Sequence, residues 1–258
     1  MNKMFENRVA IVTGGSDGIG RATSELLARR GAHVAILARG MEKLEATRDA
    51  IAGDGGSVEI HSIDLGDTEA YAALISKIAH AHARLDMLVN NAMSVHYAPI
   101  EKLAMKHWRS DFAVNADAVF AGTQTAIAAM RERGEGGSIV NVASTTAIRA
   151  APFMTSYSAS KAAMIQFSAV AAMETARDNI RINCVVPGQV QTAGNEVFAR
   201  KAPEVASRTA EAIPMGRGGT PEELAESIVF LLSDAAAYIT GVALPVDGGK
   251  AAQLYLPG

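Results

Sequence analysis

A glycine-rich turn between an apolar strand and a helix is the feature that most constrains this fold. Residues 9–12 form a short, apolar, β-branched run, which predicts a strand. Residues 13–20 follow at once with glycines spaced G-x-x-x-G-x-G, and residues 21–30 have a helical pattern. Such a turn lets backbone N–H groups and the positive end of a helix approach a pyrophosphate. The start of the chain therefore predicts a dinucleotide-binding unit, with an ordinary tight connection as the alternative.

Short apolar runs alternate with helical stretches along the whole chain. Strands are expected at residues 9–13, 33–38, 57–63, 87–90, 138–143, 181–186 and 242–246. Helices are expected at residues 19–29, 41–52, 68–81, 102–133, 156–176 and 221–232. Continuous apolar strands are typical of parallel strands covered on both faces, and the repeated order predicts right-handed crossovers in a doubly wound α/β sheet.

Composition excludes several other classes of protein. The chain has 258 residues, of which 49% are hydrophobic, so one α/β domain over residues 1–258 can bury a large core. A net charge of −3 gives no basic excess for a nucleic-acid partner. The single cysteine, Cys184, allows no intrachain disulfide. Without a signal-peptide core or a long apolar run, a cytoplasmic protein with no membrane partner is expected.

Tyr157 and Lys161 form the pattern that says most about chemistry. They are four residues apart at the start of an expected helix and follow Ser144, which closes a strand-like run. Positions i and i+4 share one helix face, so the two side chains can approach each other. At roughly 4 Å and an effective dielectric of about 20, the attraction between the ammonium and the phenolate is on the order of 4 kcal/mol. We expect the ammonium to lower the pKa of the Tyr157 phenol, against the cost of desolvation. A partly exposed helix face is the alternative.

Further motifs follow in a fixed order. They are Asn90-Asn91-Ala92-Met93, Asn115, Pro187-Gly188 with Thr192, and Asp247-Gly248-Gly249. With the glycine turn, Ser144 and the Tyr157–Lys161 pair, the chain resembles the short-chain dehydrogenase/reductase family over residues 8–249. The resemblance implies one Rossmann-like domain with a seven-stranded, mostly parallel sheet and helices on both faces. It also implies an NAD(P)-dependent oxidoreductase that transfers hydride between nicotinamide and a ketone or secondary alcohol.

The resemblance also implies a role for each motif residue. Tyr157 would exchange the proton, Ser144 would orient the substrate oxygen, and Lys161 would hold the nicotinamide ribose. Asn115 would anchor a water chain, with a buried asparagine satisfied within its own helix as the alternative. The implied cofactor contacts are Gly14, Ser16, Asp17, Gly18, Ile19, Gly20, Arg39, Asp64, Leu65, Asn91, Ala92, Met93, Tyr157, Lys161, Pro187, Gly188, Val190 and Thr192. Residues 8–132 would be mainly the cofactor-binding half and residues 133–258 the catalytic and substrate half.

Residues after the second expected strand favour NADP(H) over NAD(H). Ala38 stands where NAD-preferring relatives carry an acid, and Arg39 can bind a 2′-phosphate. Asp17 argues against a preference for NADP(H), because many NADP-preferring relatives have a basic residue at that position. A solvated loop arginine is the alternative for Arg39.

Residues 189–219 lack periodicity and contain Pro203 and Pro214, so an irregular mobile substrate lid is expected at about 189–219. Mostly apolar pocket candidates favour an apolar or neutral carbonyl or alcohol substrate: Met93, Val95, Ile148, Phe153, Met154, Val190 and Val197. Gln189 and Gln191 are candidate hydrogen-bonding groups, and Arg149 could receive a carboxylate. Met93 replaces the glycine usual in its motif, so it either relaxes that turn or projects its thioether into the pocket.

Two other readings concern metals and partners. The six histidines are dispersed without ligand spacing to carboxylates, so no metal site is expected. His96 is the one histidine that could border the substrate, since it lies in the loop after the fourth expected strand, but a solvated loop histidine is the favoured alternative. A homotetramer is implied by resemblance alone. A non-catalytic dinucleotide sensor or partner subunit is the alternative function, although the intact Ser144, Tyr157 and Lys161 set argues against it.

Overall fold

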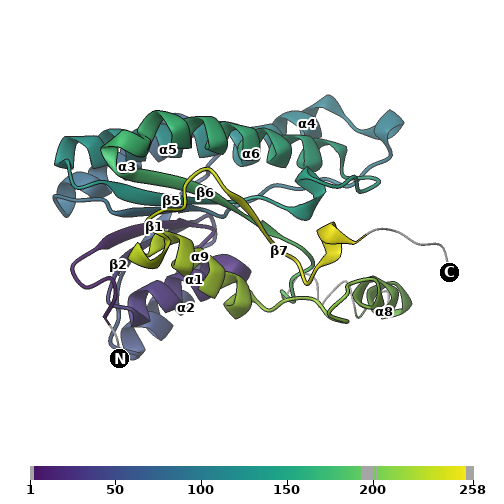
Figure 1. Ribbon diagram of the computed structural model, residues 1–258, viewed down its shortest axis with the longest axis horizontal. Helices are drawn as coiled ribbons and strands as arrows, with labels where there is room; N and C mark the ends of the chain where they lie inside the picture. The colour runs from purple at the N-terminus through teal and green to yellow at the C-terminus, as the bar shows by residue number, and fades with distance from the viewer. Residues whose placement is uncertain (1–2, 193–199, 201–202, 254–258) are drawn as a thin grey trace.

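The computed structural model describes residues 3–192, 200 and 203–253. Seven strands form one sheet in the order β3-β2-β1-β4-β5-β6-β7, and all the described strand pairings are parallel (Figure 1). The strands are β1 (Val9–Thr13), β2 (His33–Ala38), β3 (Ser57–Ser62), β4 (Met87–Asn90), β5 (Gly137–Val142), β6 (Ile180–Pro187) and β7 (Ala243–Val246). The expected doubly wound sheet is confirmed, and its described strands are parallel throughout.

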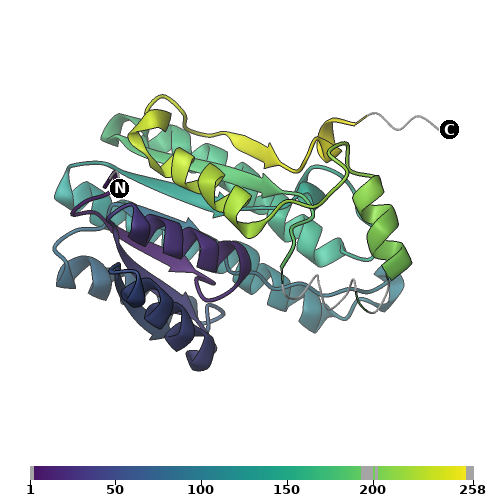
Figure 2. The ribbon, with the colours of Figure 1, turned by 90° about the horizontal axis from the view of Figure 1, so that it is seen from below.

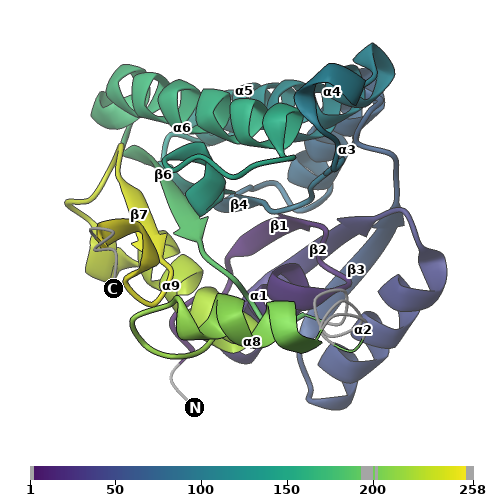
Figure 3. The same cartoon turned by 90° about the vertical axis from the view of Figure 1, so that its right-hand side faces the viewer.

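Helices cover both faces of this sheet. Helices α1, α2 and α9 lie on one face, and α3, α5 and α6 lie on the other (Figures 1 to 3). The helices are α1 (Gly18–Arg29), α2 (Met41–Gly53), α3 (Thr68–Ala81), α4 (Met105–Phe112), α5 (Ala118–Arg133), α6 (Thr155–Thr175), α8 (Pro203–Glu211) and α9 (Pro221–Leu232). Short 3₁₀ helices are Ile100–Lys102, Thr145–Ala147, Ala176–Asp178, Asp234–Ala236 and Lys250–Ala252.

The core forms two apolar layers because successive strand residues point to opposite faces. Val12 and Ile36 pack with α1, α2 and α9, whereas Ile11 and Leu37 pack with α3 and α5. All four of these side chains are fully buried. This explains why the central strand β1 has consecutive apolar residues instead of one at every second position. The edge strand β3 is only partly buried and alternates polar with apolar residues.

The sheet order places a crevice at the carboxyl ends of β1 and β4. Strand β1 pairs with β2 on one side and with β4 on the other, so the connections leave in opposite directions from this point. In doubly wound sheets, ligands bind at this switch point. The glycine turn follows β1, and the Asn90–Met93 motif begins at the last residue of β4, so both meet at this edge.

The helix expected over residues 102–133 is interrupted. The structure has a 3₁₀ turn at Ile100–Lys102, then α4, a π-helical segment Ala113–Asp117 and finally α5. Such π segments are frequent at functional sites, because the extra residue displaces a side chain from the regular helix surface. Here the displaced segment carries Asn115.

The expectation of an irregular segment at 189–219 is wrong in part. Residues 203–211 form the helix α8, which lies beyond the carboxyl ends of the strands (Figures 1 and 2). Val190 and Gly219 form a parallel bridge that joins the two ends of the segment. Residues 193–199 and 201–202, which include the pocket candidate Val197, lie outside the described residues.

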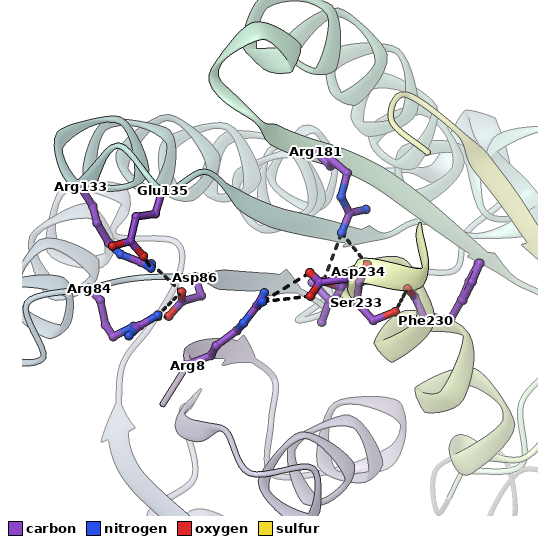
Figure 4. Close-up of polar contacts among 10 residues, drawn as sticks. Arg8, Arg84, Asp86, Arg133, Glu135, Arg181, Phe230, Ser233 and Asp234 are labelled. Atoms are coloured by element: carbon purple, nitrogen blue, oxygen red, sulfur yellow. Dashed lines mark hydrogen bonds and ion pairs between the residues drawn. The ribbon is translucent and has the colours of Figure 1, made fainter. Parts of the chain in front are cut away.

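A buried carboxylate fastens the amino-terminal ends of β1 and β4. Asp86 is 6% exposed and accepts hydrogen bonds from the Val9 backbone N–H at 2.7 Å, from Arg84 at 2.8 Å and from Arg133 at 2.5 Å (Figure 4). Burial acts to raise the pKa of Asp86, but these donors outweigh it and hold the pKa below its usual range. This end of the sheet is therefore fixed by charge-assisted hydrogen bonds, away from the crevice.

A second polar group ties β6 to the end of α9 (Figure 4). The Arg181 guanidinium donates to the carbonyl oxygens of Leu231 at 2.6 Å and Ser233 at 3.0 Å. A cation there satisfies the free carbonyls at a helix carboxyl terminus.

Candidate active site

The glycine turn forms a close-packed cradle at the start of α1. Gly14 and Gly18 have φ of 64° and 49°, the region that favours glycine. A Cβ at Gly14 would lie 2.8 Å from Asn91 Nδ2, and one at Gly20 would lie 2.1 Å from the Gly14 carbonyl oxygen. Asp17 makes no side-chain capping bond, and the first turn of α1 has no acidic residue. The turn therefore fits a diphosphate, because it exposes backbone N–H groups at a positive helix end.

Thr13 joins this turn to the loop after β4. Its hydroxyl accepts hydrogen bonds from the backbone N–H groups of Asn91 at 2.9 Å and Ala92 at 3.1 Å. The Asn91 side-chain amide donates back to the Thr13 carbonyl at 3.0 Å. Two of the expected cofactor-contacting residues are thus held beside the glycine turn.

A cavity of about 200 Å³ continues the cradle between α1 and the segment after β6. Its lining residues are Asp17, Gly18, Arg21, Ala22, Glu25, Gln191, Thr192, Pro221 and Glu222. Thr192 packs against Gly18, since a Cβ at Gly18 would lie 3.2 Å from the Thr192 methyl carbon. The volume is below the roughly 300–1,000 Å³ of whole small-molecule sites. The cavity therefore fits only part of a dinucleotide, next to the diphosphate cradle.

Tyr157 and Lys161 lie on one face of α6, as expected, and both are buried. The Lys161 Nζ donates a hydrogen bond to the Val142 carbonyl at 2.7 Å and lies 5.9 Å from the centre of the Tyr157 ring. The Tyr157 hydroxyl faces the sulfur of Met93 at 3.8 Å. The phenol and the amine are therefore neighbours that donate to different partners.

The expected lowering of the Tyr157 pKa is wrong in this structure. Burial raises the pKa of Tyr157 to about 12; the Ser144 hydroxyl opposes this rise, while Tyr97 and Asp111 add to it. Burial also lowers the pKa of Lys161 to about 7. The physical reason is desolvation, which disfavours the charged form of each group and weakens the ammonium as a neighbour of the phenol.

Ser144 follows β5 and caps the 3₁₀ turn Thr145–Ala147. Its Oγ accepts hydrogen bonds from the backbone N–H of Thr146 at 3.2 Å and from the Thr146 hydroxyl at 3.1 Å. A serine hydroxyl that accepts two hydrogen bonds still has its own proton to donate. Ser144 is thus arranged as a donor beside Tyr157, and its hydroxyl partly offsets the rise that burial causes in the pKa of Tyr157.

Asn115 connects the loop after β4 to α6 and is fully buried. Its amide oxygen accepts from the Ser94 backbone N–H at 2.9 Å. Its amide nitrogen donates to the Ser94 carbonyl at 2.7 Å and to the Ser160 hydroxyl at 3.0 Å. The alternative of an asparagine satisfied within its own helix is therefore wrong, because its partners lie on two other elements.

Asp111 is a buried site residue that was not expected from the sequence. Its carboxylate accepts from the hydroxyls of Ser94 at 2.8 Å and Ser156 at 2.5 Å, and the His96 Nδ1 lies 2.7 Å away. Burial acts to raise the pKa of Asp111, but these contacts hold it below its usual range. Its position four residues before Asn115, on the same helix face, was an available signal. His96 does border the site, as a partner of this carboxylate.

Arg39 and Lys43 bring two cations to the end of β2. Arg39 is exposed, and the Ser62 hydroxyl donates to its carbonyl at 3.0 Å. Lys43, on α2, lies 2.5 Å from the carboxylate of Asp17. The acidic residue that argued against NADP(H) is thus neutralised by Lys43, which the sequence reasoning did not identify.

The other expected cofactor residues occupy the same edge of the sheet. Asp64 is exposed and accepts from the Gly66 N–H at 3.0 Å, while its neighbour Leu65 is buried. Gly188 packs against Asp247, where a Cβ would approach to 2.8 Å. Ser16 and Ile19 belong to the glycine turn and the first turn of α1, and Pro187 and Val190 are buried at and just after the end of β6. The buried side-chain oxygen of Gln189 has no hydrogen-bond partner among the described residues.

Met93 adopts ordinary backbone geometry at the motif position usually held by glycine. Its side chain is 61% exposed, and its sulfur faces Tyr157. Of the two possibilities, the structure therefore supports the one in which the thioether projects, and it projects toward the Tyr157 hydroxyl.

Similarity to known proteins decides the family of this chain. Residues 14–251 match a family model described as enoyl-(acyl carrier protein) reductase. The 3-oxoacyl-(acyl-carrier-protein) reductase of Thermotoga maritima is 37% identical over 245 residues, which cover 95% of this chain and 98% of that protein. The chain belongs to the short-chain dehydrogenase/reductase family. A dichlorocyclohexadienediol dehydrogenase of this family from Sphingobium indicum is 34% identical, with 96% of this chain and 98% of that protein covered.

Solved structures of short-chain dehydrogenases/reductases have the same fold. A Beutenbergia cavernae protein assigned as an NAD(P)-dependent gluconate 5-dehydrogenase, with NADP bound at low occupancy, has a TM-score of 0.92 and 37% identity, covering 98% of this chain and all of that one. Levodione reductase has a TM-score of 0.92 and 30% identity over 97% of this chain and all of that one. The present chain is an NAD(P)-dependent oxidoreductase of this family that acts on CH–OH and C=O groups. Among the described residues, no helix is both long and apolar enough to cross a membrane.

Proposed function

We propose that this enzyme transfers hydride between NADP(H) and a ketone or secondary alcohol, with Tyr157 as the proton-exchanging group. Ser144 would orient the reacting oxygen, and Lys161 would hold the nicotinamide ribose. The observation that most supports this is the convergence of Ser144, Tyr157 and Lys161 on the edge of the sheet that also carries the glycine cradle. Fold alone would not support a reaction, because one fold can host many functions.

The proton would move from Tyr157 to the substrate during reduction. When bound, the nicotinamide supplies the hydride for the carbonyl carbon. The Tyr157 hydroxyl then donates its proton to the carbonyl oxygen, and the Ser144 hydroxyl donates a hydrogen bond to that oxygen as its negative charge develops. Because burial raises the pKa of Tyr157 to about 12, the phenol holds at neutral pH the proton that reduction requires.

Asn115 would act as a positioning residue for this centre. It holds Ser94 after β4 and Ser160 beside Lys161, so it fixes the two segments that carry the loop and the catalytic helix. Its proposed anchoring of a proton-supplying water chain rests on the family resemblance.

Exchange of Tyr157 for phenylalanine tests the central role. With NADPH and a panel of ketones, Tyr157→Phe should lower turnover by about 10²–10⁴-fold, the usual contribution of general acid catalysis. NADPH binding, followed by fluorescence, should change little. Tyr238→Phe is the matched control, because Tyr238 is fully exposed and its loss should leave turnover close to normal. Normal turnover in Tyr157→Phe would remove the proposed acid.

The preference for NADP(H) would come from Arg39 together with Lys43. Both cations are exposed near the end of β2, and the strand ends in Ala38 with no carboxylate to repel a 2′-phosphate. Structural relatives from Beutenbergia cavernae and Agrobacterium tumefaciens were solved with bound NADP, which agrees with this preference.

The substrate would be a small apolar or neutral carbonyl compound. Met93, Ile148 and Met154 are apolar candidates near Tyr157, and Arg149 is exposed with one hydrogen bond to the Ile148 carbonyl. Relatives are named for acyl-carrier-protein, cyclohexadienediol, gluconate and levodione substrates, so family membership alone leaves several carbonyl classes.

Several broader expectations belong to the same proposal. Residues 8–132 would chiefly bind the cofactor, residues 133–258 would supply the catalytic groups, and the segment 189–219 with α8 would cover the substrate. A homotetramer is supported by exposed Phe120 on α5 and exposed Val170 and Met173 on α6, which present apolar surface on the long central helices. A cytoplasmic location rests on sequence composition.

A further inference from the structure

Three histidines and one glutamate meet at the β3 edge of the sheet, away from the catalytic residues. His33 is the first residue of β2, Glu59 and His61 lie on the edge strand β3, and His82 is the capping residue after α3. Tyr157 and Lys161, in contrast, lie at the carboxyl ends of the strands. Sequence spacing does not group these histidines, because they are separated by 21 or more residues. They come together through the pairing of β2 with β3 and the position of the end of α3 beside these strands.

The side-chain nitrogens converge on one carboxylate. The Nε2 atoms of His82 and His33 lie 3.2 Å and 3.6 Å from the same oxygen of Glu59. The Nε2 of His61 lies 3.4 Å from the other oxygen. The ligand atoms of His33, Glu59 and His82 all lie within 4.8 Å of one another. In a tetrahedral site with bonds of about 2.0–2.1 Å, neighbouring ligand atoms are about 3.3 Å apart, so the three ligand atoms would have to approach one another by at most about 1.5 Å.

Within the described structure, two ring nitrogens in this cluster lack hydrogen-bond partners, and one of them could bind a cation instead. The Nδ1 of His33 lies 2.7 Å from the Ser57 hydroxyl, which fixes the ring and directs Nε2 toward Glu59. The buried Nε2 atoms of His33 and His61 have no hydrogen-bond partner among the described residues. In the part of the chain that the structure describes, no lysine or arginine forms an ion pair with Glu59, and the side-chain nitrogens beside it belong to the three imidazoles.

We propose that His33, Glu59 and His82 bind a divalent transition-metal ion of the Zn²⁺ type, and that on binding His61 Nε2, now 3.4 Å from the second carboxylate oxygen, closes to donate to it. Two imidazoles and one carboxylate favour Zn²⁺ over Mg²⁺ or Ca²⁺, which prefer oxygen ligands. The Glu59 carboxylate also carries a negative charge that a bound cation would offset. The ion would connect β2, the edge strand β3 and the end of α3, so its role would be to stabilise this edge of the sheet.

Metal titration of a chain without a polyhistidine tag tests the site. After dialysis against a chelator, calorimetry with Zn²⁺ should give one equivalent bound per chain, and Mg²⁺ should give none. Co²⁺ should produce the visible absorption of a four- or five-coordinate site. His82→Gln and His33→Gln should each weaken Zn²⁺ binding by at least about 10-fold, and His61→Gln by about 10-fold or more, as for residues that orient a ligand.

His80→Gln is the matched control, because His80 lies two residues from His82, is exposed and instead contacts the Ser76 carbonyl at 2.7 Å. It should bind Zn²⁺ as tightly as the unaltered chain. Glu59→Gln retains size and polarity but lacks the charge, and it should also lose the site while keeping its circular dichroism spectrum.

The proposal is overturned if the unaltered chain binds no stoichiometric Zn²⁺. It is equally overturned if folded His82→Gln or Glu59→Gln binds Zn²⁺ with unchanged affinity. Metal binding and spectra are read without turnover, so the result is independent of the proposed oxidoreductase mechanism.

Discussion

The sulfur of Met93 lies 3.8 Å from the phenolic oxygen of Tyr157, so a thioether is the group that faces the proposed catalytic proton. A thioether is a weak acceptor and a flexible apolar side chain. A substrate carbonyl that accepts the proton of Tyr157 must take the place of this sulfur. Met93 is therefore in a position to restrict the size of the group next to the reacting carbon.

Replacing Met93 tests this restriction. Met93→Gly should raise kcat/KM for bulky ketones several-fold relative to small ketones, because the 61% exposed side chain no longer occupies the approach to Tyr157. Steady-state kinetics with a series of ketones of increasing size measures this ratio. Met93→Leu is the control for volume without sulfur and should keep the original size preference. An unchanged preference in Met93→Gly would exclude Met93 from the substrate pocket.

Lys161 should make the stability of the protein depend on pH. Burial lowers its pKa to about 7, whereas in the unfolded chain a lysine titrates near ~10.4. Between these values the unfolded state binds more protons, so stability gains up to about 1.4 kcal/mol per pH unit as pH rises. The stability of Lys161→Met lacks this increase with pH. The free energy of unfolding of the variant, relative to that of the unaltered chain, should therefore be highest below pH 7 and should fall toward pH 9.

Urea unfolding at several pH values, without added cofactor, measures the difference. Lys77→Met is the control, because Lys77 is exposed on α3 and its exchange should shift stability equally at each pH. A constant difference between Lys161→Met and the unaltered chain from pH 6.5 to 9 would contradict the buried, low-pKa amine.

Charge reversal at the end of β2 tests the preference for NADP(H). Arg39→Asp should raise the dissociation constant of NADPH by at least about 10-fold, since a bidentate contact to phosphate is replaced by repulsion. The dissociation constant of NADH should change less. Lys43→Gln should have a smaller effect in the same direction, because it leaves Asp17 unneutralised.

Fluorescence titration with both cofactors gives the two constants. Arg48→Asp is the control for charge reversal. Arg48 is an exposed arginine on α2 that pairs with Asp49, away from the end of β2. Equal losses of NADPH and NADH affinity in Arg39→Asp would refute a contact with the 2′-phosphate.

The sheet was predictable because most of its parallel strands are short apolar runs and each crossover contains a segment with a helical pattern. The glycine turn was also predictable, since Gly14 and Gly20 occupy places where a Cβ would collide with backbone or amide groups. Both features are local in sequence. The helix α8 was missed, because its strongly polar surface and flanking prolines resemble those of a loop.

The electrostatic state of the site was not predictable from spacing. The i, i+4 rule gives the shared face of Tyr157 and Lys161, but the sign of each pKa shift depends on burial, which is a tertiary property. The contacts of Asp111 with Ser94 and Ser156, and of Lys43 with Asp17, join elements far apart in sequence. Only folded packing brings such groups together.

Asp86 should contribute strongly to stability, away from the active site. It is 6% exposed and accepts hydrogen bonds from Arg84, Arg133 and the Val9 N–H, so Asp86→Asn should lower the free energy of unfolding by about 2 kcal/mol. Because its folded pKa is lowered, this contribution is present above the unfolded pKa of ~3.9 and is lost as pH falls through the folded pKa.

Asp178→Asn is the control: it breaks an exposed pair with Arg131 and should lower the free energy of unfolding by less than about 1 kcal/mol. Chemical unfolding at pH 7 distinguishes the two, and equal small losses would mean that the Asp86 network is as weak as a surface ion pair.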